Sequence, residues 1–187
     1  RQDSWGGSRE KRTRFPIEVL TKVQHVVAEK EASHFIIGYR FSPEEIEEPG
    51  IRFEDTMFLL NTLAEYEPDY FHISANSYQR TSIVNQEDTE PLINKYIKMQ
   101  SAQLAKIPLI GVGSIAQRQD AEHALELGYD LLSVGKAYLV EPQWTDKISQ
   151  NEEVEQFVDI HDQKVLHIPS PLWKVMDFMI LDKEEEH

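Results

Sequence analysis

The chain has 187 residues, of which 40% are hydrophobic and 28% charged, and its formal net charge is −14 at pH 7. This size and composition are typical of one soluble globular domain. The 33 acidic side chains outnumber the 19 basic ones, which argues against nucleic acid and against an anionic membrane as partners, because both require a basic surface. The absence of cysteine excludes disulfides, thiolate zinc ligands and a thiol nucleophile. We expect a cytoplasmic protein without a signal peptide or membrane span.

Short apolar runs alternate with helical patterns along the chain. Continuous apolar runs of this length are typical of buried parallel strands. The predicted strands lie within residues 34–42, 69–74, 107–113 and 131–135, and the helical patterns cover residues 14–30, 53–66, 90–106 and 117–128. This order predicts an α/β fold in which crossover helices join parallel strands.

The first helical segment has a recognisable start. Ser8 is the predicted N-cap, and Glu10 then falls in the first turn, near the positive end of the helix dipole. We expect Arg12 and Arg14 to form surface or structural ion pairs, as isolated arginines usually do. The apolar face of this helix is predicted to carry Val19, Val23, Val26 and Val27.

Two consecutive predicted strands run into a glycine and then a helix. Gly113-Ser114 follows the third strand, and Gly135-Lys136 follows the fourth. Backbone N–H groups at such helix starts favour an anion. In a TIM barrel, the loops after strands seven and eight form a phosphate site of this kind.

A dinucleotide-binding unit is an alternative for this region. "GVGSIA", residues 111–116, fits the loose pattern G-x-G-x-x-G/A. A Rossmann unit also requires an acidic residue just after the next strand, where this chain has Gly135-Lys136, whereas Asp130 lies before that strand. A simpler alternative is that the glycines only turn the chain.

Three blocks of the sequence form a recognisable set. The blocks are Trp5-Gly6-Gly7-Ser8 followed by Glu10, Arg12, Arg14 and Phe15; "YRFSP" at 39–43; and the segment from "IPLIGVGSI" at 107–115 through "GKAYL" to Trp144. Together they resemble the C-terminal half of the Old Yellow Enzyme family. Trp5 stands where the family has Tyr, and Lys11 stands where Asn is common.

This resemblance implies an FMN-dependent NAD(P)H oxidoreductase with a TIM (β/α)8 barrel. The chain would begin mid-barrel, and its four strands would be strands five to eight, which fits a fragment without an initiator Met. Residues 1–150 would form half of the barrel, and residues 151–187 a helical extension docked on it. We therefore expect a missing N-terminal half-barrel, or self-association, as the protein partner.

The resemblance also implies cofactor-binding residues. It places Arg40 beside the flavin pyrimidine edge, where a fixed guanidinium stabilises the negative charge of the reduced ring. It assigns the FMN phosphate to Gly113, Ser114, Gly135 and Lys136. Lys136 replaces the usual Arg, which keeps the charge but loses the bidentate fork. The alternatives are a structural Arg40 paired with a rim carboxylate and a solvated surface Lys136.

Other polar residues lie in or after the second predicted strand. We expect His72 to be a packed strand histidine, and Ser74 to be near the substrate side of the barrel mouth. Residues 75–90 are long and polar for a βα loop, which is typical of a substrate-facing rim. Within that loop, Tyr78 and Arg80 are candidates for contact with substrate or nicotinamide.

The expected reaction needs groups that this chain lacks. In the family, the substrate-binding pair and the proton donor precede the "GGS" stretch, so no catalytic residue is assigned here. The whole protein would use NADH or NADPH to reduce FMN, which would then reduce an activated alkene or a related small-molecule acceptor. His161 and His167 lack metal-ligand spacing, and residues 171–181 are a predicted terminal helix. The alternative function is a non-redox phosphate-binding or assembly α/β module.

Overall fold

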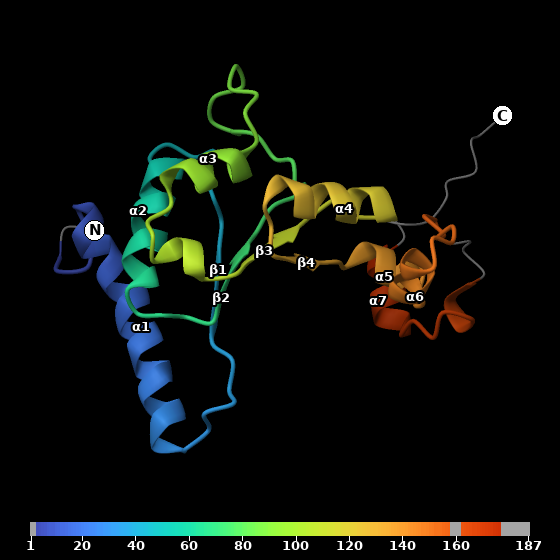
Figure 1. The fold of residues 1–187 in the computed structure, drawn as a ribbon, viewed down its shortest axis with the longest axis horizontal. Helices are drawn as coiled ribbons and strands as arrows, with labels where there is room; N and C mark the ends of the chain where they lie inside the picture. Colours follow the sequence, from blue (N-terminus) through green and yellow to red (C-terminus); the bar gives the residue numbers. More distant parts are fainter. Residues whose placement is uncertain (1–2, 158–161, 177–187) are drawn as a thin grey trace. The chain divides into compact units, whose positions relative to one another are not determined.

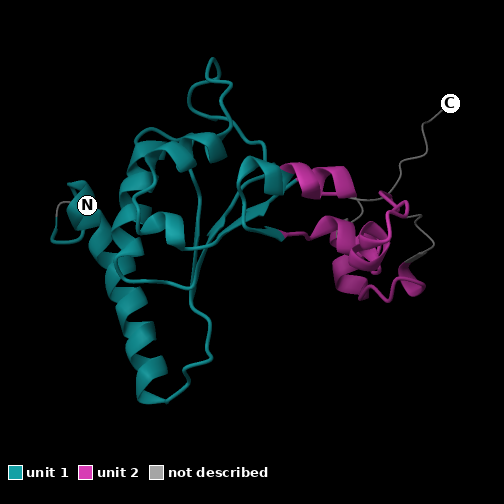
Figure 2. Cartoon of the chain, viewed as in Figure 1, with its two compact units in different colours: residues 1–113, 124–132 teal, residues 114–123, 133–187 magenta. Residues whose placement is uncertain are grey.

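The computed structural model describes residues 3–157 and 162–176, which form two compact units (Figures 1 and 2). The first unit comprises residues 1–113 and 124–132, and the second comprises residues 114–123 and 133–187. The boundaries between the units follow residues 113, 123 and 132, and the last two fall inside the fourth helix and the fourth strand. The predicted division after residue 150 stays a prediction.

A four-stranded sheet with the order β1-β2-β3-β4 organises the fold (Figure 1). β1 pairs with β2, and β2 with β3, in parallel. The strands are β1 Gly38–Phe41, β2 Tyr70–Ile73, β3 Leu109–Val112 and β4 Leu131–Ser133. All four lie inside the runs predicted from sequence, and the predicted parallel α/β arrangement is confirmed.

The two faces of the sheet have different environments. Phe41, Phe71, Ile73 and Leu109 are buried, with Phe71 fully inaccessible. They share the core of the first unit with apolar side chains of the helices that follow β1 and β2, such as Leu60 and Leu92. Side chains alternate along a strand, so the residues between them occupy the opposite face, which is more open. The helices and 3₁₀ turn of this part of the chain are α1 Arg9–Glu29, α2 Phe53–Ala64, α3 Leu92–Met99, η1 Leu104–Lys106 and α4 Arg118–Leu127.

The helix predicted over residues 90–106 is interrupted. α3 ends at Met99, and Gln100 is extended with ψ 138°. Asn61 of α2 holds both sides of the break, because its side chain donates to the Met99 carbonyl at 3.1 Å and accepts from the Ser101 N–H at 2.7 Å. Ser101 Oγ then accepts from the Leu104 N–H at 3.1 Å, which starts η1. A tertiary contact thus overrides the local helical pattern.

α1 starts as predicted but buries a different face. Ser8 is its N-cap, and the Ser8 hydroxyl accepts a hydrogen bond from the Lys11 N–H at 3.4 Å. Leu20 is buried, whereas Val19, Val23 and Val26 are 39–51% exposed. Together with the exposed Phe15, these three valines form an apolar stripe at helical spacing, which we call the α1 stripe.

Asp55 of α2 anchors α1. Its Oδ1 lies 2.5 Å from Arg9 Nε and 3.2 Å from Arg12 Nη2, while its Oδ2 accepts from the Arg52 N–H at 3.2 Å. Burial opposes ionisation, but the hydrogen bonds from Arg9 and the Arg52 backbone and the charges of Arg9 and Arg12 outweigh it and lower the pKa of Asp55. The ion pair expected for Arg12 is confirmed. Arg14 instead donates to the Ser4 carbonyl at 3.0 Å.

Two aspartates tie the amino ends of neighbouring strands together. Asp69, just before β2, donates its N–H to the Ile37 carbonyl at 2.8 Å, and its carboxylate accepts from the Ile37 N–H at 2.6 Å. Asp130, just before β4, makes the same pair of bonds to Leu109 at 3.0 and 2.8 Å. Asp130 therefore has a structural role at the amino end of the sheet.

The second unit is built from short helices after β4. Val140 and Ile168 form its small core, with Leu139, Leu166 and Trp173 packed against them. Its elements after β4 are α5 Lys136–Val140, α6 Trp144–Ser149, η2 Asp162–Lys164 and α7 Ser170–Met176. The helix predicted over residues 171–181 is confirmed as far as Met176, and residues 177–181 lie outside the described part.

None of the helices within the described residues combines the length and the apolar character that crossing a membrane requires.

We predict that Asp55→Asn lowers the free energy of unfolding by about 0.5–1 kcal/mol at pH 7, the range of a partly exposed ion pair. A carboxyl with a lowered pKa in the folded state stabilises above its unfolded pKa and loses this effect as pH falls through the folded value. The difference should therefore shrink progressively as the pH falls below the ordinary aspartate range and toward the lowered pKa of Asp55. Urea unfolding at pH 7 and at an acidic pH below that range measures it, with Glu54→Gln, an exposed first-turn residue of the same helix, as control. An equal deficit at both pH values would contradict the ion-pair account.

Candidate functional site

Arg40 and His72 lie side by side on the open face of the sheet. They are register partners on β1 and β2, and partners in a parallel pair point to the same face. Arg40 is exposed and His72 is half-exposed. His72 is a strand histidine, as expected from sequence, and it is only partly packed, because it alternates with the buried Phe71 and Ile73.

The ionisation of His72 reflects this position. Burial, and then the positive charge of Arg40, lower its pKa below the ordinary histidine value. Its Nε2 atom is buried and has no hydrogen-bond partner among the described residues. The pair thus presents one permanent cation and one neutral imidazole near the carboxyl end of two neighbouring strands.

A pocket of about 300 Å³ lies beside β1. β1 is the edge strand of the sheet, so its outer side lacks a neighbouring strand within the described chain. Burial raises the pKa of Tyr39, which lines this pocket. The other lining residues include Arg9 and Arg12 of α1, Arg40 and Ser42 of β1 and its exit, and Asp55 and Thr56 of α2.

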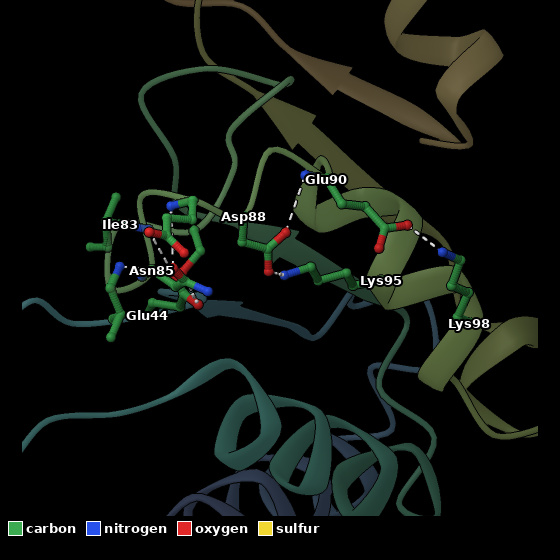
Figure 3. A network of polar contacts seen from close by, with 10 residues as sticks. Glu44, Ile83, Asn85, Asp88, Glu90, Lys95 and Lys98 are labelled. Carbon is green, nitrogen blue, oxygen red and sulfur yellow. Dashed lines mark hydrogen bonds and ion pairs between the residues drawn. The ribbon is translucent and has the colours of Figure 1, made fainter.

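The loop after β2 is held by a buried carboxylate (Figure 3). Glu44, which is only 7% exposed, follows β1 and accepts from the Ser82 hydroxyl at 3.1 Å and from the Ile83 N–H at 2.9 Å. Ser82 Oγ in turn accepts from the N–H groups of Val84 and Asn85 at 3.2 and 3.0 Å. The loops after two neighbouring strands are therefore fixed to each other.

The end of the same loop is joined to α3. Asp88 pairs with Lys95, and Glu90 pairs with Lys98, as the right side of Figure 3 shows. Near its start, the Tyr78 carbonyl accepts from the buried Tyr129 hydroxyl at 3.0 Å. The loop predicted as a substrate-facing rim is therefore well ordered by contacts at both ends.

Tyr78 and Arg80 differ in their suitability for contact with a ligand. Tyr78 is 5% exposed and belongs to the core, so its side chain is not presented to solvent. Arg80 is half-buried, and its Nε has no hydrogen-bond partner within the described chain. Ser74 is half-buried directly after β2, and its N–H donates to the Phe41 carbonyl at 2.7 Å.

Gly113 is required by close packing. Its φ is +97°, and an added Cβ would lie 2.5 Å from the Asn76 carbonyl carbon and 2.6 Å from the Ser77 nitrogen. Its carbonyl accepts from the Tyr78 N–H at 3.0 Å. Only glycine allows this approach of the loop after β3 to the loop after β2.

The remaining predicted phosphate residues belong to the second unit. Ser114 is exposed with φ +53°, and Gly135 and Lys136 are exposed at the start of α5. The Asp120 carboxylate accepts from the N–H groups of Ala116 and Gln117 at 3.0 and 2.9 Å. Two of the backbone donors at the start of α4 are thus already bound, so the predicted cluster of free N–H groups is smaller than expected there.

The described residues contain no group of three or more His, Asp or Glu side chains that could hold a metal ion. His167 lies in the described part of the second unit, and His161 lies outside it.

Residues 1–155 match the NADH:flavin oxidoreductase / NADH oxidase family, so the chain belongs to this family. It is 59% identical to the NADH:acrylate oxidoreductase of Vibrio harveyi over all of this chain and 18% of that protein. It is 49% identical to the NADH:fumarate oxidoreductase of Klebsiella pneumoniae (strain 342) over 97% of this chain and 20% of that protein. The chain thus spans about a fifth of the length of these two relatives.

Solved structures define the fold. The old yellow enzyme homologue from Zymomonas mobilis superposes with a TM-score of 0.62 at 15% sequence identity, over 92% of this chain and 45% of that one. The prediction is confirmed: the chain is the C-terminal half of a TIM (β/α)8 barrel, with strands five to eight, of the Old Yellow Enzyme type.

Substitution by alanine should change the free energy of unfolding at Gly113 but not at Gly135, the two glycines of the predicted phosphate loops. Gly113→Ala should lower the free energy of unfolding by about 1–3 kcal/mol, because it forces strain at positive φ and adds a clash with the Asn76 backbone. Gly135→Ala should be nearly neutral, because its φ is −116° and no atom of the described residues lies within 4 Å of the added Cβ. Thermal unfolding of both variants measures the contrast. Equal melting temperatures would contradict the packing described for Gly113.

Proposed function

We propose that this chain forms part of the FMN site of a longer NADH-dependent flavin oxidoreductase. The observation that carries the proposal is the position of Arg40, exposed on the open sheet face near the carboxyl end of β1, in a chain that belongs to this family. Ligand sites of TIM barrels lie at the carboxyl ends of the strands.

The residues present fit FMN. Arg40 offers hydrogen-bond donors and a permanent charge, and the unpartnered Nε2 of neighbouring His72 indicates that this face lacks a component in the described chain. Gly113 and Ser114, followed by Gly135 and Lys136, would hold the phosphate group. Exposed Lys136 would supply the positive charge, and no atom in the described part of the chain crowds Gly135.

FMN would supply the ability to accept and return a hydride, with NADH or NADPH as reductant. Arg40 would hold its guanidinium against the ring edge where negative charge develops on reduction, and so favour the reduced form. Lys136 would bind the phosphate as a point charge and keep the cofactor in place. The group that protonates the substrate would come from outside this chain.

The terminal acceptor of the longer protein is proposed to be a small unsaturated carboxylate. The two relatives named above are an acrylate and a fumarate oxidoreductase. Both named acceptors are alkenes activated by a conjugated carboxyl group, which agrees with the activated alkene expected from sequence.

The partner of this half-barrel is proposed to be the remaining half, supplied by the longer protein. Three features support this: the edge strand β1, the pocket beside it and the α1 stripe. An open parallel edge and an exposed apolar helix face both favour a covering partner. In the isolated chain, self-association would cover the same three surfaces.

The FMN assignment is tested in the longer protein by two substitutions with different expected effects. Lys136→Glu should weaken FMN binding on the order of 10- to 100-fold, because a hydrogen bond to a charged group contributes about 1.5–3 kcal/mol. Arg40→Ala should keep the FMN bound but make it harder to reduce. Flavin absorbance and a redox titration measure the two effects, and Lys174→Glu, an exposed lysine of α7, is the charge-matched control.

Full flavin content in Lys136→Glu would contradict the phosphate assignment. A wild-type longer protein that binds inorganic phosphate but no flavin would favour the alternative, a non-redox phosphate-binding or assembly module.

We predict that co-expression of this chain with the preceding half-barrel yields a yellow complex. Val23→Glu should weaken that complex at least about tenfold, because it places an unpaired charge in an apolar contact. Thr21→Glu, an exposed residue of α1 outside the stripe, should not. Co-purification and flavin absorbance measure the assembly. Equal loss in both variants would contradict a role for the α1 stripe.

A further inference from the structure

Arg80 is a half-buried arginine whose charge is not paired within the described part of the chain. Its Nε atom is buried and has no hydrogen-bond partner there. Charged side chains are rarely buried unless they are paired, and a buried polar atom without a partner calls for a specific explanation. Acceptors are not scarce, because the chain has 33 acidic side chains and only 19 basic ones.

Almost all other arginines of the described residues bind an acceptor. The pairs are Arg9 and Arg12 with Asp55, Arg14 with the Ser4 carbonyl, Arg52 with Glu48, and Arg118 with Glu122. Among the described arginines, only Arg40 shares the unpaired state of Arg80. Since the proposed function places Arg40 at the flavin, the second unpaired arginine also points to a ligand.

Arg80 lies in a stretch that crosses the carboxyl ends of three strands. Before it, the Tyr78 N–H donates to the Gly113 carbonyl, after β3, at 3.0 Å. After it, the Ser82 hydroxyl donates to the Glu44 carboxylate, after β1, at 3.1 Å (Figure 3). Arg80 is therefore held between the exits of β1 and β3, at the end of the strands where TIM barrels bind their ligands.

The neighbours of this stretch belong to this chain and not to the missing half-barrel. β2 has β1 on one side and β3 on the other, so strands of the missing half border only the outer strands β1 and β4. The Arg80 carbonyl also accepts from the Leu92 N–H, at the start of α3, at 2.8 Å. Its backbone is thus fixed before a ligand arrives, which lowers the entropic cost of binding.

The chemistry of an arginine restricts the missing acceptor. A guanidinium offers its N–H groups as a planar fork, which matches the two oxygens of a carboxylate or a phosphate. Nε–H is one of the donors of this fork, and in Arg80 it has no partner among the described residues. The proposed reaction uses two ligands with such oxygens, namely NADH with its phosphates and a small unsaturated carboxylate.

We propose that Arg80 binds an oxyanion, a carboxylate or a phosphate, of a ligand that exchanges electrons with the flavin. The inference rests on the proposed function and deepens it, because it assigns a residue to the recognition of the reductant or of the acceptor. Arg40 acts on the flavin ring in that proposal, whereas Arg80 acts on the ligand that approaches the ring.

The test uses the longer protein loaded with FMN and the substitution Arg80→Gln, which removes the charge. Flavin absorbance follows each half-reaction alone in the absence of oxygen: reduction by NADH, and reoxidation by acrylate. Arg80→Gln should raise the saturation constant for at least one of the two ligands on the order of 10- to 100-fold. Lys98→Gln, which removes an exposed charge of α3, should leave both constants within about twofold of wild type.

The two half-reactions identify the source of the oxyanion. A rise for NADH alone indicates a phosphate, a rise for acrylate alone indicates a carboxylate, and a rise for both indicates one site that the two ligands share. Each of these results supports the inference. Saturation constants within about twofold of wild type for both ligands would overturn it.

Two further measurements cover a variant that does not fold and a role in catalysis alone. Arg80→Lys keeps the charge but loses the fork, and it should weaken binding of the affected ligand at least about threefold. If that ligand is NADH, titration with tetrahydroNAD, which morphinone reductase binds in a solved structure, should show the same loss without turnover. Unchanged binding in Arg80→Lys would overturn the inference.

Failure of this inference differs from failure of the proposed function. A wild-type longer protein without flavin would refute the proposed function, and the inference would fall with it. Loss of flavin in Arg80→Gln would assign Arg80 to the FMN itself, which overturns only the inference. A lower melting temperature with unchanged saturation constants would give Arg80 a structural role, with the same consequence.

Discussion

The parallel register of β1 against β2 is the constraint on which the candidate site depends. Side chains alternate along a strand, so the register that buries Phe41 and Phe71 also places Arg40 beside His72 on the opposite face. A slip of one residue would exchange the two faces and bury the guanidinium. Asp69 secures this register, because it both donates to and accepts from the Ile37 backbone.

The loops at the carboxyl ends of the strands depend on one another. Glu44, after β1, holds Ser82 and Ile83 of the loop after β2. Gly113, after β3, packs against the start of that same loop, and its carbonyl binds the Tyr78 N–H. The loops after β1, β2 and β3 are thus held in place by contacts with one another. A ligand bound at one of these loops would therefore meet a surface that the other two loops already fix.

The surfaces that remain open have a common physical character. The face with Arg40 and His72 combines a permanent charge with a ring nitrogen that has no partner among the described residues, and the α1 stripe presents apolar side chains to solvent. Both surfaces are unfavourable when they are exposed to water, and both become favourable when a group of matching polarity covers them. A flavin edge suits the first surface, and an apolar helix face suits the second, which agrees with a chain that spans about a fifth of its two named relatives.

The sequence alone determined the features that depend on local chemistry. The order of helices and strands follows from hydrophobic periodicity, and the N-cap at Ser8 follows from its hydroxyl. Local chemistry did not predict three other features: the break between α3 and η1, the exposure of the α1 stripe, and the contact of Glu44 with Ser82. Each depends on residues far apart in the chain, such as Asn61 at the helix break. The neighbourhood of Arg40 and His72 was likewise decided only by the tertiary structure, because a strand's own pattern does not specify which residue of the next strand lies beside it.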